Sequence, residues 1–290
     1  MVDLFVPHGG NQQICYTFDF MEYLHGYTEE ERNRLTQQAS MLQGMIYEYL
    51  DLSEHTNMLE IGCGTGGQSK ILLETYPALK LTSLDREEEQ IKQANENMSL
   101  YPSINNRVTF GVADAEKIPF PDNSFDASFI VWVLEHASDP LAILKESYAK
   151  LQPGGKIYIT EVYNQSLNIQ PEAPYTVEYW RHFNETQSAF GGNPDVGIEL
   201  GRLLSESGFL NIKTRNLNRH FDKRNIEQRN AMFDFFLKLM FSAKGGMITS
   251  GRIDVALCKQ VENEFEKLKQ NSESIFYYCP IQAVGEKQLI

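Results

Sequence analysis

The sequence predicts a doubly wound α/β fold: a mostly parallel sheet of seven strands, with helical lid insertions. Two observations carry this expectation. Short apolar runs alternate with amphipathic helical patterns from Met58 to Glu161, and strands that alternate with helices form parallel sheets covered on both faces. A glycine-rich loop, Gly62 to Gly67, directly follows the first apolar run, as expected where a strand turns sharply into a helix beside a ligand.

The elements of the alternating part follow in a regular order. A capping box at Thr28 to Glu31, with apolar residues from Leu35 to Tyr49 at spacings of three and four, first predicts a long N-terminal helix. The elements predicted after it are strand Met58 to Ile61, helix Gly67 to Tyr76, strand Leu79 to Leu84, a helix from Glu87, strand Val108 to Val112, strand Phe125 to Trp132, a helix from Pro140, a turn at Pro153-Gly154-Gly155 and strand Lys156 to Glu161.

Beyond Glu161 the alternation breaks. Residues 163–195 are rich in Tyr, Phe, Pro and Asn without a sustained period, which indicates an inserted cap. A second insertion, residues 220–272, is predicted to hold two amphipathic helices, Ile226 to Ala243 and Thr249 to Gln270. Between the insertions we expect helix Asp195 to Ser207 and strand Asn211 to Leu217.

The tail Ser274 to Val284 is apolar enough to return to the sheet as a strand. Pro280 conflicts with this interpretation, because proline cannot donate a ladder hydrogen bond. We therefore divide the chain into an N-terminal helical lid segment, residues 1–50, and one domain, residues 51–290, that carries the two insertions.

Composition and charge exclude several partners. The 290 residues hold 26 Lys and Arg against 39 Asp and Glu, a net charge of −13, and no basic run could follow a phosphate backbone, so we expect no nucleic acid. The longest apolar stretch, Phe129 to Leu134, is far shorter than the roughly 20 residues that cross a bilayer, so we expect no membrane. Four cysteines without paired spacing and an N-terminus without a targeting pattern predict a cytoplasmic protein.

The glycine loop alone fits two classes of adenosine cofactor. Gly62, Gly64 and Gly66 fit the spacing G-x-G-x-G. Gly62, Gly64 and Gly67 fit G-x-G-x-x-G, the dinucleotide fingerprint. Asp85 ends the second strand, where a carboxylate can accept hydrogen bonds from a ribose in either class. Glu60 favours S-adenosylmethionine, because a carboxylate before the loop repels a pyrophosphate but suits a ligand with an ammonium and a sulfonium group.

Further motifs follow the loop in a fixed order. They are Glu60-Ile-Gly-Cys-Gly-Thr-Gly66, Asp85, Val112-Ala-Asp-Ala-Glu116, Phe125-Asp126, Val133-Leu-Glu-His136 and Leu151-Gln-Pro-Gly-Gly155. In this order and spacing they resemble the class I S-adenosylmethionine-dependent methyltransferases, especially small-molecule enzymes similar to the quinone-biosynthesis group. The similarity covers roughly Met45 to Glu161 and implies a Rossmann-like methyltransferase fold for the domain.

The resemblance also implies the cofactor contacts. The loop backbone would carry the methionine portion, Asp85 the ribose, and Asp114 with the Ala115 backbone the adenine edge, while residues after the fourth strand border the sulfonium. The predicted set is Glu60, Gly62, Cys63, Gly64, Gly66, Asp85, Arg86, Asp114, Ala115, Val131, Trp132 and His136. From the residues alone, Asp114 could instead be a turn residue, and Cys63 a small buried residue beside the ligand.

The acceptor side is less specific. Methyl transfer is a displacement at carbon, so alignment and exclusion of water supply much of the acceleration, and a base is needed only for some acceptors. His136, Glu135 and Glu161 are candidate acid–base residues because each lies at the carboxyl edge of the sheet, with packing or a local ion pair as the alternative. Aromatic residues predict a pocket for an apolar or planar acceptor, or else ordinary lid core: Tyr16, Tyr23, Tyr27, Tyr179 and Trp180.

These observations predict an enzyme that moves a methyl group from S-adenosylmethionine to O, N or C of a small organic acceptor and releases S-adenosylhomocysteine. No Asn/Asp-Pro-Pro-Tyr/Phe motif follows the fourth strand, so the chain does not resemble the amino-methylating enzymes of DNA bases or glutamine. We expect a monomer or homodimer without a metal site. The alternatives are a catalytically idle S-adenosylmethionine-binding scaffold and, disfavoured by Glu60, a nicotinamide oxidoreductase.

Overall fold

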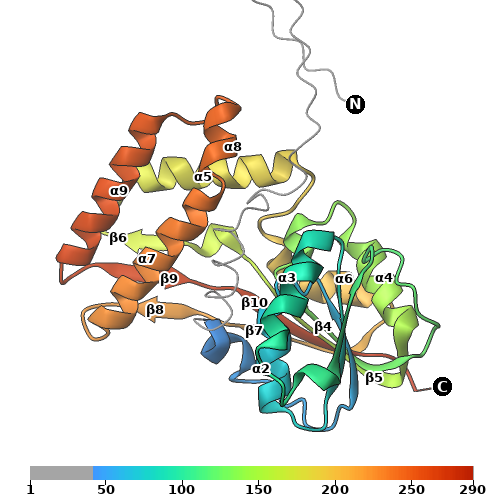
Figure 1. Ribbon diagram of the computed structural model, residues 1–290. Helices are drawn as coiled ribbons and strands as arrows, with labels where there is room; N and C mark the ends of the chain where they lie inside the picture. The colour runs from blue at the N-terminus through green and yellow to red at the C-terminus, as the bar shows by residue number, and fades with distance from the viewer. Residues whose placement is uncertain (1–41, 290) are drawn as a thin grey trace, which may run out of the picture.

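A seven-stranded sheet organises residues 42–289, the part of the chain that the computed structural model describes (Figure 1). Six of its strands run parallel and one, β10, runs antiparallel to both of its neighbours. Their order across the sheet is β3 (Val108–Val112), β2 (Lys80–Asp85), β1 (Asn57–Ile61), β4 (Phe125–Val131), β5 (Leu151–Glu161), β10 (Ile281–Glu286) and β7 (Leu210–Asn216). The predicted doubly wound, mostly parallel sheet of seven strands is confirmed.

Helices cover both faces of this sheet. On β1, Met58 packs into one buried cluster with Leu72 of α2 (Gly67–Thr75), whereas Leu59 packs into another with Leu144 of α4 (Pro140–Lys150). Successive strand residues point to opposite faces, so one strand serves two cores. The remaining helices of this part are α3 (Glu88–Ser99) and α6 (Leu200–Glu206). Among the described residues, no helix combines the length and apolarity needed to span a membrane.

The Pro153-Gly154-Gly155 segment differs from the prediction. It lies inside β5, which begins directly after α4, and does not form a separate turn before the strand. The pairing with β4 shifts register between Phe125 and Ala127, and Gly154 takes a positive φ of 78°. The backbone of Lys287 exchanges hydrogen bonds with Gly154 and Gly155 here, which explains why the strand ladder continues through the glycines.

A second lobe packs beside the sheet, and we call it the helical lobe (Figure 1). It contains a small antiparallel sheet of β6 (Asn168–Gln170), β9 (Ile275–Tyr278) and β8 (Arg219–Phe221). Its helices are α5 (Pro174–Ala189), α7 (Ile226–Ser242), α8 (Lys244–Thr249) and α9 (Val255–Gln270). The second predicted insertion supplies α7 to α9, and the first contains α5, a regular helix where the sequence indicated irregular chain.

The predicted tail strand is in fact two strands. Residues Cys279 and Pro280 separate β9, in the small sheet, from β10, in the large one. The carbonyl of Pro280 accepts a hydrogen bond from the Leu217 backbone N–H at 2.9 Å. Pro280 has no backbone N–H to donate, but it lies between β9 and β10, where neither sheet requires this donor. The position between the strands removes the conflict that Pro280 raised in the sequence.

The described part of the predicted N-terminal helix begins at Leu42. Residues 42–47 are helical, and Leu42 and Ile46 are buried. Tyr49 lies in a turn and is 51% exposed, so the predicted apolar stripe ends at Ile46. The capping box at Thr28 lies outside the described residues, and the lid role of residues 1–50 stays a prediction.

Arg229 of α7 joins the end of α9 to β9. Its side chain is fully buried and donates hydrogen bonds to the carbonyls of Ser272 and Ser274, each at 3.0 Å. An Arg229→Met substitution should lower the free energy of unfolding by about 2–3 kcal/mol, because it leaves buried carbonyls unpaired. Arg224→Met is the control, since Arg224 is exposed and pairs only with nearby Asp222. Denaturant unfolding of both variants checks this, and equal stabilities would contradict it.

Candidate functional site

The glycine loop connects β1 to α2 at the carboxyl edge of the sheet. Gly62, Gly64 and Gly66 have φ values of 70°, 52° and 80°, a region that residues with a side chain rarely adopt. A Cβ on Gly62 would overlap the Val133 side chain, so this loop packs directly against the segment that follows β4. The loop therefore requires glycine for its backbone shape and for its close approach to the neighbouring strand end.

Hydrogen bonds hold the loop against the end of β2. The backbone N–H groups of Gly62 and Cys63 both donate to the Leu84 carbonyl, at 2.7 and 3.0 Å. The Asp85 carboxylate accepts from Gly64 N–H at 2.8 Å and from Glu87 N–H at 3.0 Å, and burial raises its pKa. Each carboxylate oxygen has a further lone pair, so Asp85 can fix the loop and still accept from a ligand hydroxyl.

Glu60 lies beneath the loop, where it is buried. Its Oε2 accepts hydrogen bonds from the hydroxyls of Ser69 and Ser83, at 2.5 and 2.6 Å. Burial raises the pKa of Glu60 to about 7, so much of it is neutral at physiological pH. The sequence argument treated Glu60 as a full negative charge; in the structure this charge is a weaker reason to prefer one cofactor.

The turn after β4 is strained and firmly held. Trp132 has a positive φ of 59°, which disfavours a bulky residue. Its backbone N–H donates to the Thr160 carbonyl on β5 at 3.1 Å. The next two N–H groups, of Val133 and Leu134, both donate to Glu161 Oε1, at 2.9 and 2.8 Å. These contacts set the direction of the Trp132 side chain.

Glu161 and Glu135 form a buried acidic pair under this turn. Glu161 is fully buried, and its Oε2 has no hydrogen-bond partner among the described residues. Burial and the neighbouring Glu135 raise the pKa of Glu161 to about 8. Glu135 accepts from the Gln187 side chain at 2.8 Å, and its Oε1 lies 3.7 Å from His136 Nε2. Glu161 thus has the contacts of a positioning residue, whereas Glu135 and His136 remain the candidates for proton transfer.

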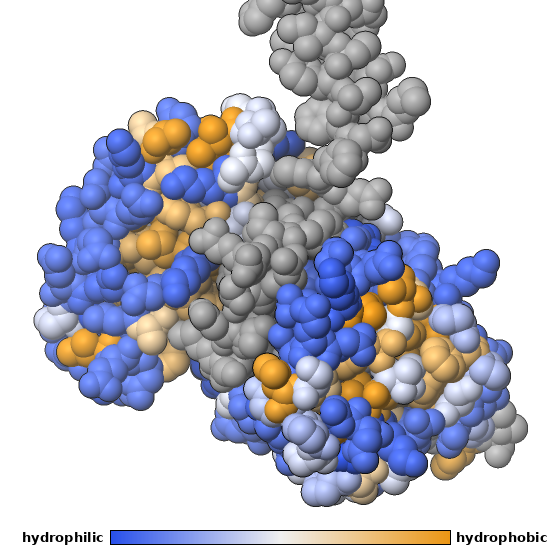
Figure 2. All heavy atoms as spheres, in the orientation of Figure 1, coloured by the Kyte–Doolittle hydropathy of each residue, from blue (hydrophilic) through white to orange (hydrophobic). Residues whose placement is uncertain are grey.

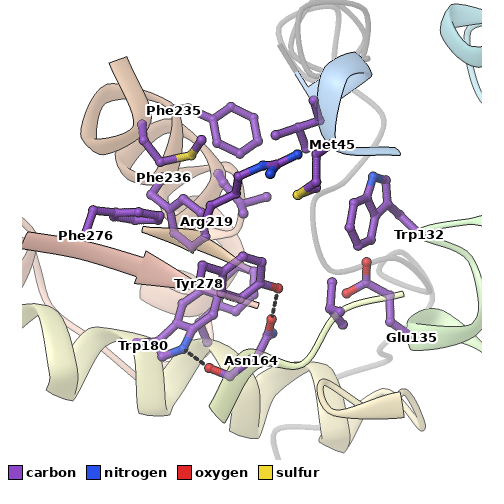
Figure 3. Close-up of a pocket in the computed structure, with 15 residues that line it drawn as sticks. Met45, Trp132, Glu135, Asn164, Trp180, Arg219, Phe235, Phe236, Phe276 and Tyr278 are labelled. Carbon is purple, nitrogen blue, oxygen red and sulfur yellow. Dashed lines mark hydrogen bonds between the residues drawn. The ribbon is translucent and has the colours of Figure 1, made fainter. Parts of the chain in front are cut away.

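A pocket lies between this turn and the helical lobe (Figure 3). Trp132 and Glu135 line it from the sheet side, and Trp180, Phe236 and Tyr278 line it from the helical lobe. Two hydrogen bonds to Asn164 brace the far wall: Tyr278 Oη donates to its side chain at 2.8 Å, and Trp180 Nε1 donates to its carbonyl at 3.0 Å. The wall is aromatic, and among its polar groups those of Asn164, Trp180 and Tyr278 pair with one another.

The outer surface carries both hydrophobic and hydrophilic side chains. Figure 2 shows hydrophobic surface on both lobes, framed by hydrophilic side chains. The pocket itself is lined mainly by apolar and aromatic side chains. A hollow of this kind, with few polar groups on an aromatic wall, is typical of small-molecule sites.

Comparison with known proteins identifies the sheet part of the chain. Residues 59–159, which include the glycine loop, Asp85 and the turn after β4, match the family model described as a methyltransferase domain. The chain contains a class I S-adenosylmethionine-dependent methyltransferase domain. The resemblance that the ordered motifs indicated is confirmed.

Several relatives share this methyltransferase domain. A 27-O-demethylrifamycin SV methyltransferase of Amycolatopsis mediterranei is 32% identical over 46% of this chain and 48% of its own length. A ubiquinone/menaquinone biosynthesis C-methyltransferase of Rickettsia bellii is 27% identical over 57% of this chain and 72% of its own. The structure of a Haemonchus contortus phosphoethanolamine N-methyltransferase with S-adenosyl-L-methionine covers 87% of this chain and 52% of its own, at 18% identity and a TM-score of 0.52. The chain spans about half the length of the first of these relatives, and the third shows the fold alone.

The predicted cofactor residues of the methyltransferase domain lie along one edge of the sheet. Val131 ends β4 and is buried, and Cys63 is buried in the loop, where burial raises its pKa well above the ordinary value. Asp114 is exposed and accepts from the Glu116 N–H at 2.9 Å, a turn contact that leaves its second oxygen for a ligand. Ala115 is half-buried beside it, and Arg86 forms a surface ion pair with Glu87. Their contacts with a cofactor stay predictions.

The predicted acceptor residues divide into three groups. Trp180 lines the pocket. Tyr179 does not: it is fully buried in the helical lobe, and its hydroxyl donates to the Met240 carbonyl at 3.0 Å, so it belongs to the core. Its neighbour faces the pocket because adjacent helical residues point in different directions. The other predicted residues, Tyr16, Tyr23 and Tyr27, lie outside the described residues.

The sequence interpretation missed several pocket residues. Arg219, Asn164 and Tyr278 all line the pocket, and none was a candidate. They come from segments far apart in the chain, and each sits in a stretch without a motif. One signal was available for Arg219: residues 213–224 hold five Lys and Arg against one Asp, in a chain that is acidic as a whole.

Proposed function

We propose that this protein is an S-adenosylmethionine-dependent methyltransferase that transfers the methyl group to O, N or C of a small organic acceptor. One observation carries the proposal. The glycine loop, through Gly62, touches the same short turn, Trp132 to Glu135, that lines the aromatic pocket. A cofactor held by the loop and an acceptor held in the pocket would therefore meet at this turn.

The loop fits the cofactor of the family. Its three glycines take positive φ values, and Asp85 keeps lone pairs for a ribose beside the Gly64 N–H that it accepts. The loop backbone would hold the methionine portion, and Asp114 with Ala115 would hold the adenine. When bound, S-adenosylmethionine supplies an electrophilic methyl group on a sulfonium. The face of Trp132 would add cation–π attraction at that position.

The side chains of the protein would align the acceptor, exclude water from the pocket and accept a proton. The aromatic walls exclude water and hold the acceptor in line, the largest expected contribution for a direct displacement. Where the acceptor loses a proton, the Glu135 and His136 pair is the nearest titratable group to the pocket that can take it. Glu161 holds the turn that carries both residues.

Methyl-labelled S-adenosylmethionine in a single-turnover assay with a metabolite extract tests the proposal. A labelled small product supports transfer. Tight S-adenosylhomocysteine binding without any product would favour the idle scaffold, and tighter binding of NADH would favour the oxidoreductase. Calorimetry with each ligand distinguishes these outcomes.

An Asp85→Asn variant should weaken S-adenosylhomocysteine binding roughly 10- to 100-fold, because the substitution replaces a charge-assisted acceptor with an amide. Asp122→Asn is the matched control, since Asp122 pairs with Lys150 away from the loop. We expect its affinity to stay within about twofold of the wild type. Equal affinities of the two variants, measured by calorimetry, would remove Asp85 from the site.

We further propose that the protein works in the cytoplasm as a monomer or homodimer. The three described cysteines, Cys63, Cys258 and Cys279, are free and buried, which suits a reducing compartment. Fractionation of cells and sedimentation of the purified protein test these two points.

A further inference from the structure

Arg219 gives the pocket a charge that the proposed function does not use. Among the described residues that line the pocket, it is the only cation, and Glu135 is the only carboxylate. Arg219 lies on β8, at the helical-lobe side of the pocket. Figure 3 places its side chain among Met45, Phe235 and Phe236. A positive charge is thus surrounded largely by apolar groups.

This charge is weakly compensated. The Arg219 side chain is only 26% exposed, and its described counter-charge is Glu48, whose carboxylate is 3.6 Å away and about half exposed. Within residues 42–289 its guanidinium makes no hydrogen bond to another residue. Arg229, by contrast, donates to three carbonyls. A guanidinium stays charged and presents five donors in a planar fork, so a partly buried one without acceptors favours binding of an anion.

We infer that the acceptor is an amphipathic acid, an inference that rests on the proposed function. Its anionic group, a carboxylate or a phosphate, binds the guanidinium fork of Arg219, the geometry that matches both groups bidentately. Its apolar or planar body fills the aromatic cavity between Trp180 and Phe236. The net charge of −13 makes this local recognition necessary, because the chain as a whole repels anions.

The same charges orient the acceptor. Glu135 lies on the sheet side of the pocket with Trp132, and Arg219 comes from the helical-lobe side (Figure 3). An acid therefore points its anionic end toward β8 and away from Glu135. The opposite end faces the turn that touches the glycine loop, so the atom that receives the methyl group is remote from the acid. Binding energy at the remote end then holds the reacting end in place.

Intrinsic fluorescence provides a direct binding assay. The chain has two tryptophans, and both, Trp132 and Trp180, line the pocket. The probes are 5-phenylpentanoate, 5-phenylpentanamide, 5-phenylpentylamine and 5-phenylpentyl phosphate, which share one body and differ in the head group. We expect the carboxylate or the phosphate to bind about 10-fold or more tightly than the amide. The tighter of the two anions identifies the head group.

Substitution of Arg219 tests the contact itself. Arg219→Met should weaken binding of the preferred anion about 10- to 100-fold while the amide changes less than about threefold. Arg215→Met is the matched control: it removes the same charge from β7, where the exposed Arg215 lies over the Tyr49 ring at 4.0 Å and does not line the pocket. We expect the control to bind all four probes as the wild type does.

Two results would overturn the inference: equal affinity for the anions and the amide, or preference for the amine. Equal anion binding by the Arg219 and Arg215 variants would overturn it as well. Calorimetry with S-adenosylhomocysteine on the same proteins confirms that each variant is folded. Failure of wild-type protein to bind S-adenosylhomocysteine would count against the proposed function alone, because the head-group preference is measured without cofactor.

Discussion

Replacing Gly62 by alanine is expected to lower the affinity for S-adenosylhomocysteine at least 100-fold. The residue has a φ of 70°, and an added Cβ overlaps Val133, whose branched side chain cannot rotate freely away. The loop must therefore move away from the turn after β4, and its backbone N–H groups lose their positions. Calorimetry measures the change in affinity, and single-turnover transfer measures its effect on catalysis.

Gly245→Ala is the control for this prediction. Gly245 lies exposed in α8, and a Cβ there meets nothing within 4 Å. Alanine should leave cofactor affinity unchanged and increase stability slightly, because it is the better helix former. A Gly62→Ala protein that binds S-adenosylhomocysteine as tightly as the control would show that the close packing of the loop has no role in binding.

Two substitutions of Glu161 should show whether this residue positions the turn after β4 or acts as an acid–base catalyst. Glu161→Ala removes the acceptor of the Val133 and Leu134 N–H groups, each worth about 1–3 kcal/mol when buried and unpaired, so activity should fall roughly 100-fold. Glu161→Gln keeps that acceptor and resembles the protonated acid, so it should retain activity within about fivefold. Loss of activity in both variants, with an altered pH–rate profile, would instead make Glu161 an acid–base catalyst.

The same residue should make stability depend on pH. Its pKa rises from an ordinary 4.5 to about 8 in the folded protein. Between these values the native state keeps a proton that the unfolded state has released, so the free energy of unfolding falls as pH rises through this window. Glu60, with a pKa of about 7, contributes in the same direction. Denaturant unfolding at pH 5 and at pH 8.5 should show a free energy of unfolding that is several kcal/mol lower at the higher pH, and Glu161→Gln should remove more than half of this difference.

The sheet was predictable because its signals are local. Apolar runs, the glycines of the loop and the N-cap at Asp139, whose side chain accepts from Ala142 N–H, each act within a few residues. Because these signals are local, the observed bounds of strands β1 to β4 and of the helices between them agree closely with the expected ones. The order of motifs along the chain then identified the cofactor class.

The helical lobe was less predictable because its structure depends on distant contacts. The buried face of α5 mixes aromatic side chains with Thr176 and Gln187, which donate hydrogen bonds to Glu264 and Glu135, so the buried face is not a continuous apolar stripe. Arg219 likewise resembles any surface arginine until β8 pairs with β9. Arg219 was therefore hidden from a sequence interpretation that rests on local motifs.

Residues 275–286 have a consequence for how the chain becomes folded. They form β9, the central strand of the small sheet, and β10, an inner strand of the large one, separated only by Cys279 and Pro280. Of the strands in the described chain, these two leave the ribosome last. Until then β7 has no partner in the large sheet, and β6 and β8 have none in the small sheet. Both sheets are thus completed together, after synthesis of this segment, and the pocket that Phe276 and Tyr278 of β9 help to line forms only in that final step.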